Sequence, residues 1–260
     1  MPRLCANLSM LFTEVDFLQR FEAAANAGFS GVEYLFPYDF SSAQIKAELE
    51  RNRLTQVLFN LPAGDWANGE RGIACHPDRV EEFYAGVDLA IAYAKVLGNT
   101  QINCLAGIKP QGVDEGLIEK TFIDNLRYAA DRLQANGIGL VMEMINTLDI
   151  PGFYLNTTAQ ALAIRDKVGS QNLLLQYDLY HMQIMEGDLA RTLQNHLSVI
   201  RHVQLADNPG RHEPGTGEIN YSFLFKHLDR LGYRGWIGCE YKPLTTTEAG
   251  LGWLKTHNLV

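Results

Sequence analysis

Short apolar runs recur along the chain, and polar stretches separate them. The clearest runs cover residues 55–61, 101–105, 139–143, 173–178, 200–204 and 236–240. Short continuous apolar runs are typical of strands that are buried on both faces. Between the runs, apolar residues recur at helical spacing, which predicts helices over residues 14–27, 78–97 and 114–136, among others. In total we expect eight strands and eight helices in strict alternation.

This alternation predicts an α/β fold with a parallel sheet. About 250 residues is typical of a closed (β/α)8 TIM barrel, and this chain has 260. No linker or change in composition divides the chain, so we expect a single barrel domain over residues 1–260. An open, doubly wound sheet is the alternative, but no GxGxxG motif follows the first strand to support its usual nucleotide-binding form.

Four of the apolar runs end in a side chain with a ligand oxygen: Glu143, Asp178, Gln204 and Glu240. In a closed barrel the carboxyl ends of the strands meet at one mouth. A single acidic residue there is more often a helix cap or half of an ion pair, but four successive strands are harder to explain in this way. Because all the ligand atoms are oxygen, the set suits Mg²⁺ or Mn²⁺ better than Zn²⁺.

Several residues near these strand ends could bind a substrate. His181 follows Asp178 by three residues and could donate to a substrate oxygen, or be a structural histidine in a loop. Arg211 and Lys242 could pair with an anionic substrate, although a solvated surface charge is the default interpretation. Trp66 lies in a long, glycine-rich loop, residues 62–72, that could be a lid or a surface excursion.

Charge and composition narrow the class of protein. The formal net charge is −8, which argues against nucleic acid or an anionic membrane as a partner. The four cysteines form no CxxC pair, and we expect them to be reduced core residues of a cytoplasmic protein. The N-terminus has no long apolar region typical of a signal peptide, and no apolar run is long enough to cross a membrane.

Several segments resemble the hydroxypyruvate isomerase family, which belongs to the wider group of xylose-isomerase-like TIM barrels. The resemblance covers nearly the whole chain. It is carried by residues 6–12, 32–38, 60–66, 178–181, 217–221 and 238–243.

The resemblance implies interconversion of hydroxypyruvate and 2-hydroxy-3-oxopropanoate (tartronate semialdehyde), within glyoxylate and carbohydrate acid metabolism. It implies that Glu143 and Glu240 transfer protons through an enediolate, and that His181 and Arg211 hold the substrate. A divalent metal would be bound by the two glutamates with Asp178 and Gln204. Related epimerases usually have a histidine where this chain has Gln204, so a strict metal requirement stays open.

Other functions stay open from the sequence. The same site could serve a 2-oxo-tetronate isomerase or a ketose 3-epimerase. A nuclease of the endonuclease IV type would need several zinc-binding histidines and a basic face, which this chain does not offer. A noncatalytic sugar-acid binding protein would not need two opposed glutamates. The expected partner is a small anionic hydroxy-keto acid, and the chain could form a homo-oligomer.

Overall fold

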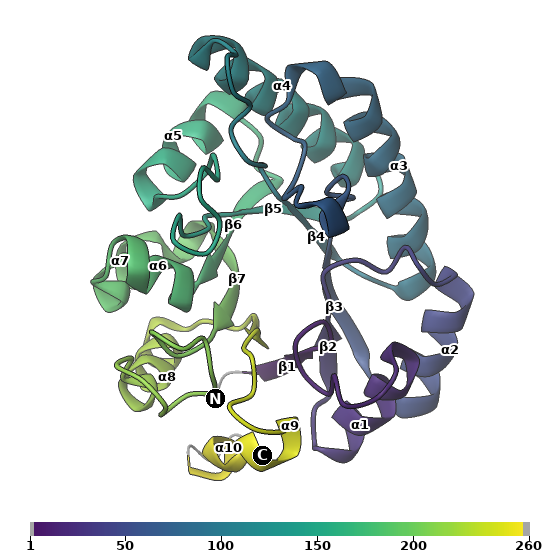
Figure 1. Cartoon of the computed structure of the whole chain (residues 1–260), viewed down its shortest axis with the longest axis vertical. Coiled ribbons are helices and arrows are strands. Elements are labelled where there is room, and N and C mark those ends of the chain that lie inside the picture. The colour runs from purple at the N-terminus through teal and green to yellow at the C-terminus, as the bar shows by residue number, and fades with distance from the viewer. Residues whose placement is uncertain (1–2, 257–260) are drawn as a thin grey trace. The chain divides into compact units, whose positions relative to one another are not determined.

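The eight predicted strands form a closed barrel in chain order, in a computed structural model that describes residues 3–256 (Figure 1). The pairing of β8 with β1 is parallel, as closure of a parallel barrel requires. This confirms the predicted α/β barrel. The strands are β1 Arg3–Asn7, β2 Gly31–Glu33, β3 Thr55–Asn60, β4 Gln101–Cys104, β5 Gly139–Glu143, β6 Leu173–Asp178, β7 Ile200–Leu205 and β8 Trp236–Cys239.

The helices do not alternate strictly with the strands, so that part of the prediction is wrong. Within residues 3–256, two helices lie between β6 and β7, and two more follow β8. The helices are α1 Arg20–Asn26, α2 Ser42–Asn52, α3 Val80–Leu97, α4 Glu115–Gln134, α5 Thr158–Val168, α6 Leu179–Met185, α7 Leu189–His196, α8 Tyr221–Leu231, α9 Thr247–Gly250 and α10 Gly252–Thr256.

The first predicted helix starts later than expected, at Arg20 rather than Glu14, after a 3-10 turn at Phe17–Gln19. The reason is that Glu14 is used elsewhere: its carboxylate accepts hydrogen bonds from the backbone N and the hydroxyl of Thr247. The expected last helix is divided at Leu251, which lies between two glycines. Glycine weakens a helix because it loses more backbone freedom than other residues do.

The chain forms two compact units, residues 3–57 with 177–256 and residues 58–176, and each is described by itself. The single-domain prediction therefore stays a prediction. In the first unit, β1 pairs with both β2 and β8, and β8 pairs with β7. The register aligns Cys5 of β1 with Gly238 of β8, and Gly238 with Gln204 of β7. These three strands carry residues of the polar cluster that is described below.

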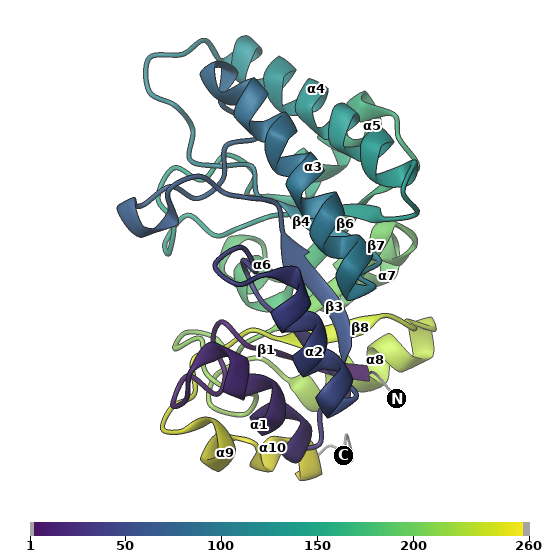
Figure 2. The same ribbon diagram turned by 90° about the vertical axis from the view of Figure 1, so that its right-hand side faces the viewer.

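In the second unit, β4 pairs with β3 and β5, and β5 pairs with β6. Helix α4 packs against β5 and lies between α3 and α5 (Figure 2). Its buried face carries Ile118, Phe122, Leu126 and Leu133, spaced by four or seven residues. An apolar face with this spacing buries itself against the sheet, and this burial holds the short strands in place.

Two predictions from composition can be compared with the structure. All four cysteines are free and buried, so the expectation of reduced core cysteines is confirmed. Among residues 3–256, none of the helices combines the length and the apolar character that crossing a membrane would require.

Candidate active site

Glu240 follows the last residue of β8, and its carboxyl group is almost completely buried, as Glu240 is 7% exposed. The guanidinium of Arg211 lies beside it, with Nη2 3.3 Å from Glu240 Oε1. Burial raises the pKa of Glu240 to about 8; Asp178 and Glu33 raise it too, whereas Arg211 and a hydrogen bond from Gln204 lower it. Without a bound cation, Glu240 therefore holds a proton more strongly than an exposed glutamate does.

Asp178 ends β6 and is also the N-cap of α6. Its Oδ1 accepts a hydrogen bond from the backbone N of Tyr180 at 2.8 Å. Within the described chain, its buried Oδ2 has no hydrogen-bond partner. Burial raises the pKa of Asp178 to about 6, against the opposing charge of Arg211. A buried carboxylate oxygen without a donor is costly, and it suits a cation or a proton.

His181 and Arg211, which the family resemblance implies hold the substrate, lie beside each other. The distance from Arg211 Nη2 to His181 Nε2 is 3.5 Å, and the guanidinium also lies over the ring of Tyr180. Burial lowers the pKa of His181, and Arg211 lowers it further, so the imidazole is neutral. His181 lies in helix α6, so the alternative of a loop histidine is wrong. The helix was missed because it has only seven residues and directly follows a strand.

The loop after β7 holds Arg211 in place through a buried aspartate that sequence reasoning missed. Asp207 is 1% exposed, and its two oxygens accept from the backbone N of four residues. These donors are Asn208 and Ile219 to Oδ1, and Gly215 and Gly217 to Oδ2. Arg211 itself has a positive φ of 56°, which is uncommon outside glycine. The loop therefore holds this arginine in a conformation that an isolated chain would rarely adopt.

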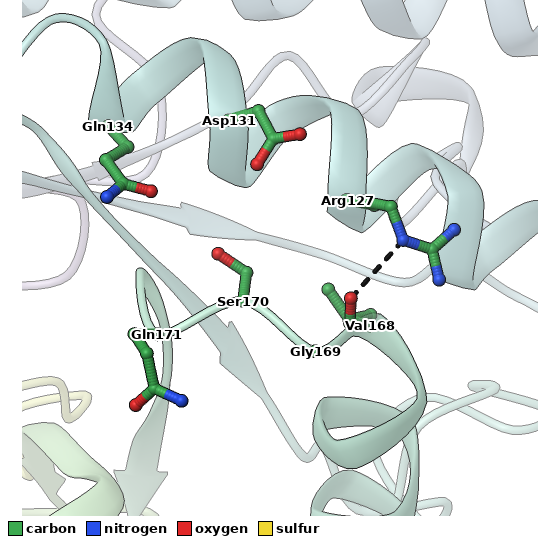
Figure 3. A pocket seen from close by; sticks show the side chains of 7 residues that line it. All are labelled: Arg127, Asp131, Gln134, Val168, Gly169, Ser170 and Gln171. Carbon is green, nitrogen blue, oxygen red and sulfur yellow. Dashed lines mark hydrogen bonds between the residues drawn. The ribbon is translucent and has the colours of Figure 1, made fainter.

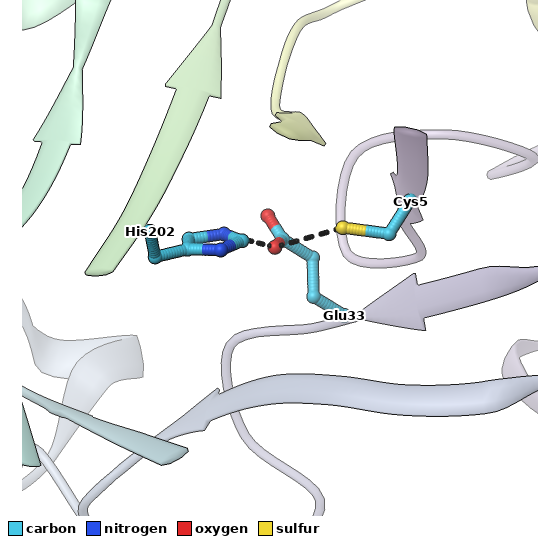
Figure 4. A group of neighbouring side chains, drawn as sticks. All are labelled: Cys5, Glu33 and His202. Atoms are coloured by element: carbon cyan, nitrogen blue, oxygen red, sulfur yellow. Dashed lines mark hydrogen bonds and ion pairs between the residues drawn. The ribbon is translucent and has the colours of Figure 1, made fainter. Parts of the chain in front are cut away.

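A second missed residue, Glu33 at the end of β2, is completely buried among four donors, two of which, Cys5 and His202, are drawn in Figure 4. Its Oε2 accepts from His202 Nε2 at 2.7 Å and from the Cys5 thiol at 3.3 Å. Its Oε1 accepts from Gln204 Nε2 at 2.7 Å and from Asn7 Nδ2 at 3.1 Å. Burial by itself raises the pKa of Glu33. The charge and hydrogen bond of His202, together with the hydrogen bonds from the Gln204 and Asn7 amides, lower it below its usual value.

The sequence does contain a signal for this cluster. Residues two apart in a strand point to the same face, and residues that can donate hydrogen bonds occur at that spacing in two of the strands. These are Cys5 and Asn7 in β1, and His202 and Gln204 in β7.

Glu143 ends β5 in the second unit and is 5% exposed. The side chain of Asn103 in β4 donates to Glu143 Oε2 at 3.0 Å and to Asn60 Oδ1 at 3.1 Å. Both asparagines lie at carboxyl ends of adjacent strands, where β3 and β4 pair in register. A carboxylate held by an amide donor has a fixed orientation, as a group that transfers protons requires.

The other two predicted substrate-binding residues have different surroundings. The side chain of Lys242 is exposed and lines a cavity of about 300 Å³ with Ser9, Thr13 and Glu14, among others. Trp66 starts a 3-10 turn, Trp66–Asn68, and the guanidinium of Arg71 stacks on its ring at 4.2 Å. Substrate contact by Lys242 and a lid role for Trp66 both stay predictions.

A further cavity of about 350 Å³ lies in the second unit, between the end of α4 and the turn before β6 (Figure 3). Arg127 donates from Nε to the carbonyl of Val168 and from Nη2 to that of Lys167, which caps the carboxyl end of α5. This turn leads into the amino end of β6, whereas active sites of TIM barrels lie at the carboxyl ends. The arrangement therefore indicates a structural role for these residues.

Comparison with known proteins identifies related chains. A family model described as a xylose isomerase-like TIM barrel matches residues 21–257. A hydroxypyruvate isomerase of Escherichia coli is 58% identical over 254 residues, which cover 98% of each chain. A 2-oxo-tetronate isomerase of Cupriavidus necator is 49% identical over 99% of each chain. A solved structure from Brucella melitensis, described as an AP endonuclease of family 2, is 49% identical, covers 99% of both chains and superposes with a TM-score of 0.96.

Proposed function

Because the chain belongs to the xylose isomerase-like TIM barrel family, and within it to the hydroxypyruvate isomerase group, we propose that it interconverts hydroxypyruvate and 2-hydroxy-3-oxopropanoate. The observation that carries this proposal is the 58% identity to the Escherichia coli hydroxypyruvate isomerase over 98% of both chains. The catalytic residues below are part of the proposal, and the local geometry of each one supports it.

The reaction moves a hydrogen between C3 and C2 of a three-carbon acid. One glutamate removes a proton from C3, and the electrons of that C–H bond form the C2–C3 double bond of an enediolate. The other glutamate delivers a proton to C2, and the proton of the C3 hydroxyl passes to the C2 oxygen, so that the C3 oxygen becomes a carbonyl and the C2 oxygen a hydroxyl. We assign these two roles to Glu143 and Glu240. The raised pKa of Glu240, about 8, suits it to deliver a proton at neutral pH.

The substrate carries a carboxylate, and Arg211 is the cation that we propose to bind it. Its guanidinium is partly buried beside Glu240 and His181, and a guanidinium pairs strongly with a carboxylate because it can form two parallel hydrogen bonds. The imidazole of His181, which is neutral, would donate a hydrogen bond to the substrate oxygen on which negative charge develops. We also propose that Lys242 and Trp66 contact the substrate from the loops that carry them.

A divalent metal, Mg²⁺ or Mn²⁺, fits the donor atoms of this site. Asp178 offers a buried oxygen without a hydrogen-bond donor among residues 3–256, and the other proposed ligands, Glu143, Gln204 and Glu240, also offer oxygen. Such a metal would stabilise negative charge on the substrate oxygens. Arg211 already compensates part of the local negative charge, so activity with and without a chelator measures how strongly the site requires the metal.

Two alternative substrates, 2-oxo-tetronate and DNA, are suggested by the names of similar proteins. The relative from Cupriavidus necator acts, by its name, on 2-oxo-tetronate, and it is 49% identical. The solved structure from Brucella melitensis is described as an endonuclease at the same identity. The net charge of −8 and the oxygen-rich donors favour a small hydroxy-keto acid over DNA. Cytoplasmic location and self-association stay predictions.

The proposed function is tested by an isomerisation assay on the purified protein. The panel contains hydroxypyruvate, 2-oxo-tetronate, free ketoses and a duplex with an abasic site, each with Mg²⁺, with Mn²⁺ and with a chelator. We expect kcat/KM to be highest for hydroxypyruvate and the chelator to reduce it. A higher kcat/KM for 2-oxo-tetronate would change the substrate and keep the chemistry. Cleavage of the duplex without isomerisation would overturn the proposal.

A further inference from the structure

The polar cluster around Glu33 has no assigned role in the reaction, although it contacts one of the proposed site residues. Glu33 accepts four hydrogen bonds, two on each oxygen, and only one of these donors, Gln204, belongs to the proposed site. The other three donors lie in strands β1 and β7 and fix the carboxylate in place; they are Cys5, Asn7 and His202. The bond to Gln204 therefore connects a rigid buried group to the reacting groups.

The backbone makes room for this carboxylate at one position. Gly238 of β8 lies between Cys5 and Gln204 in the strand register. A Cβ atom on Gly238 would overlap the Glu33 carboxyl group, with Oε1 as the nearest atom. Any other residue at position 238 would push the Glu33 carboxylate away from Gln204. The glycine and the glutamate therefore form one arrangement built from four neighbouring strands.

The orientation of the Gln204 amide follows from this arrangement. Gln204 is 1% exposed, and its Nε2 donates to Glu33 Oε1 at 2.7 Å. Turning the amide over would place its oxygen against the carboxylate of Glu33, and two acceptors in contact repel each other. Gln204 also hydrogen-bonds Glu240, so the same amide touches the carboxyl group that we propose to transfer a proton.

We propose that Glu33 is a positioning residue that fixes the amide of Gln204, and through it the carboxyl group of Glu240, in the orientation that catalysis requires. This inference rests on the proposed function, because it concerns the same site. Glu33 does not touch the substrate. Its effect reaches the reaction through one hydrogen bond, in the way that partners behind a ligand orient it.

A double-mutant cycle tests this route. Glu33→Met removes both acceptor oxygens that face Gln204 and His202, and Gln204→Met removes the amide; each change keeps most of the side-chain volume. Each single substitution should reduce kcat by about 10- to 100-fold, the usual loss when a supporting partner is removed. Since both act through the same bond, the double variant should lie within about threefold of Gln204→Met. If the losses multiply, or if Glu33→Met retains kcat within about twofold, the inference is wrong.

A control and a second variant separate positioning from stability. Asn125→Ala deletes another buried hydrogen bond, from Asn125 to the carbonyl of Ala74, far along the chain in α4. It should lower the melting temperature and leave kcat within about twofold. If Glu33→Met does not fold, Glu33→Asp replaces it in the cycle. The shorter side chain cannot reach Gln204 and His202 together, so kcat should again fall.

A spectroscopic measurement tests the orientation without any reaction. The side-chain amide signals of Gln204 are those that Gln204→Met removes from the ¹⁵N–¹H spectrum. In the unmodified protein one of its two amide protons should be protected from exchange with solvent, and Glu33→Met, which has no acceptor oxygen, should abolish the protection. Unchanged protection would overturn the inference. If the unmodified protein shows no isomerisation, the proposed function fails, and this measurement still decides the role of Glu33.

Discussion

At the scale of single residues, the first unit contains two buried glutamates, Glu33 and Glu240, whose surroundings shift their pKa values in opposite directions. Glu33 accepts from four donors, and their effect outweighs burial, so its pKa falls below the usual value. Glu240 has one nearby cation and two nearby carboxyl groups, so burial prevails and its pKa rises to about 8. Carboxyl groups with pKa values pushed apart are typical of sites that use one charged and one protonated form. The opposite pKa shifts fit the proposed roles, in which Glu33 supports the site and Glu240 transfers a proton.

The raised pKa of Glu240 predicts how stability depends on pH. Its folded pKa, about 8, lies above the reference value of 4.5, so its contribution to stability is present below pH 4.5 and is lost as pH rises to 8. With a chelator present, Glu240→Gln should therefore become more stable relative to the unmodified protein between pH 5 and pH 8. The expected gain is on the order of 3 kcal/mol, because one pKa unit corresponds to about 1.4 kcal/mol.

Denaturant unfolding at several pH values measures this difference. Glu248→Gln changes an exposed glutamate and serves as the control, since it should follow the unmodified protein at every pH. A constant difference between Glu240→Gln and the unmodified protein across this range would show that the pKa of Glu240 is not raised.

The sequence alone showed part of this picture at the residue scale. Glu240 and Asp178 were identifiable because each ends an apolar run, where a carboxylate is conspicuous. Glu33 was not, because β2 has only three residues and a glutamate in so short a strand looks like an ordinary exposed position. Its burial depends on donors from β1 and β7, which are distant in the sequence.

At the scale of elements, the loop between β7 and α8 is held in shape by hydrogen bonds to one buried carboxylate. Asp207 gathers four backbone N–H groups, and the loop presents Arg211 to Glu240 and His181. The sequence indicated a polar, turn-rich segment here but not its shape, because the shape depends on one buried carboxylate. Helix α6 was missed for a related reason: Asp178 caps it directly from the end of β6, so no loop separates strand from helix.

This loop gives a prediction about substrate binding. Asp207→Asn replaces one acceptor oxygen with a donor, which leaves two backbone N–H groups without an acceptor and costs on the order of 2–4 kcal/mol. The loop should loosen, and Arg211 should bind the substrate carboxylate less well. We expect KM for hydroxypyruvate to rise by at least about 10-fold, equivalent to about 1.4 kcal/mol. Steady-state kinetics and thermal unfolding measure both effects; a normal KM with a lowered melting temperature would contradict this role.

At the scale of the whole molecule, the alternation of apolar runs and amphipathic helices was enough to predict the closed barrel. The pattern works because a parallel strand is buried on both faces and each helix buries only one. It could not predict α6 or the division of the last helix into α9 and α10, since each of these segments is too short to show a period. The function came from the comparisons with related chains, because a barrel of this kind supports many reactions.

The central claim is that two carboxyl groups carry a proton between neighbouring carbons, and the fate of the hydrogen tests it most directly. Hydroxypyruvate with deuterium at C3 is converted in ordinary water, and the product is analysed by NMR. Because the proton that reaches C2 comes from the second glutamate, the product should carry hydrogen from solvent at C2. Glu240→Gln should lower turnover by at least about 100-fold, the scale of acid–base catalysis. Deuterium retained at C2 would show direct transfer between the carbons and contradict the account.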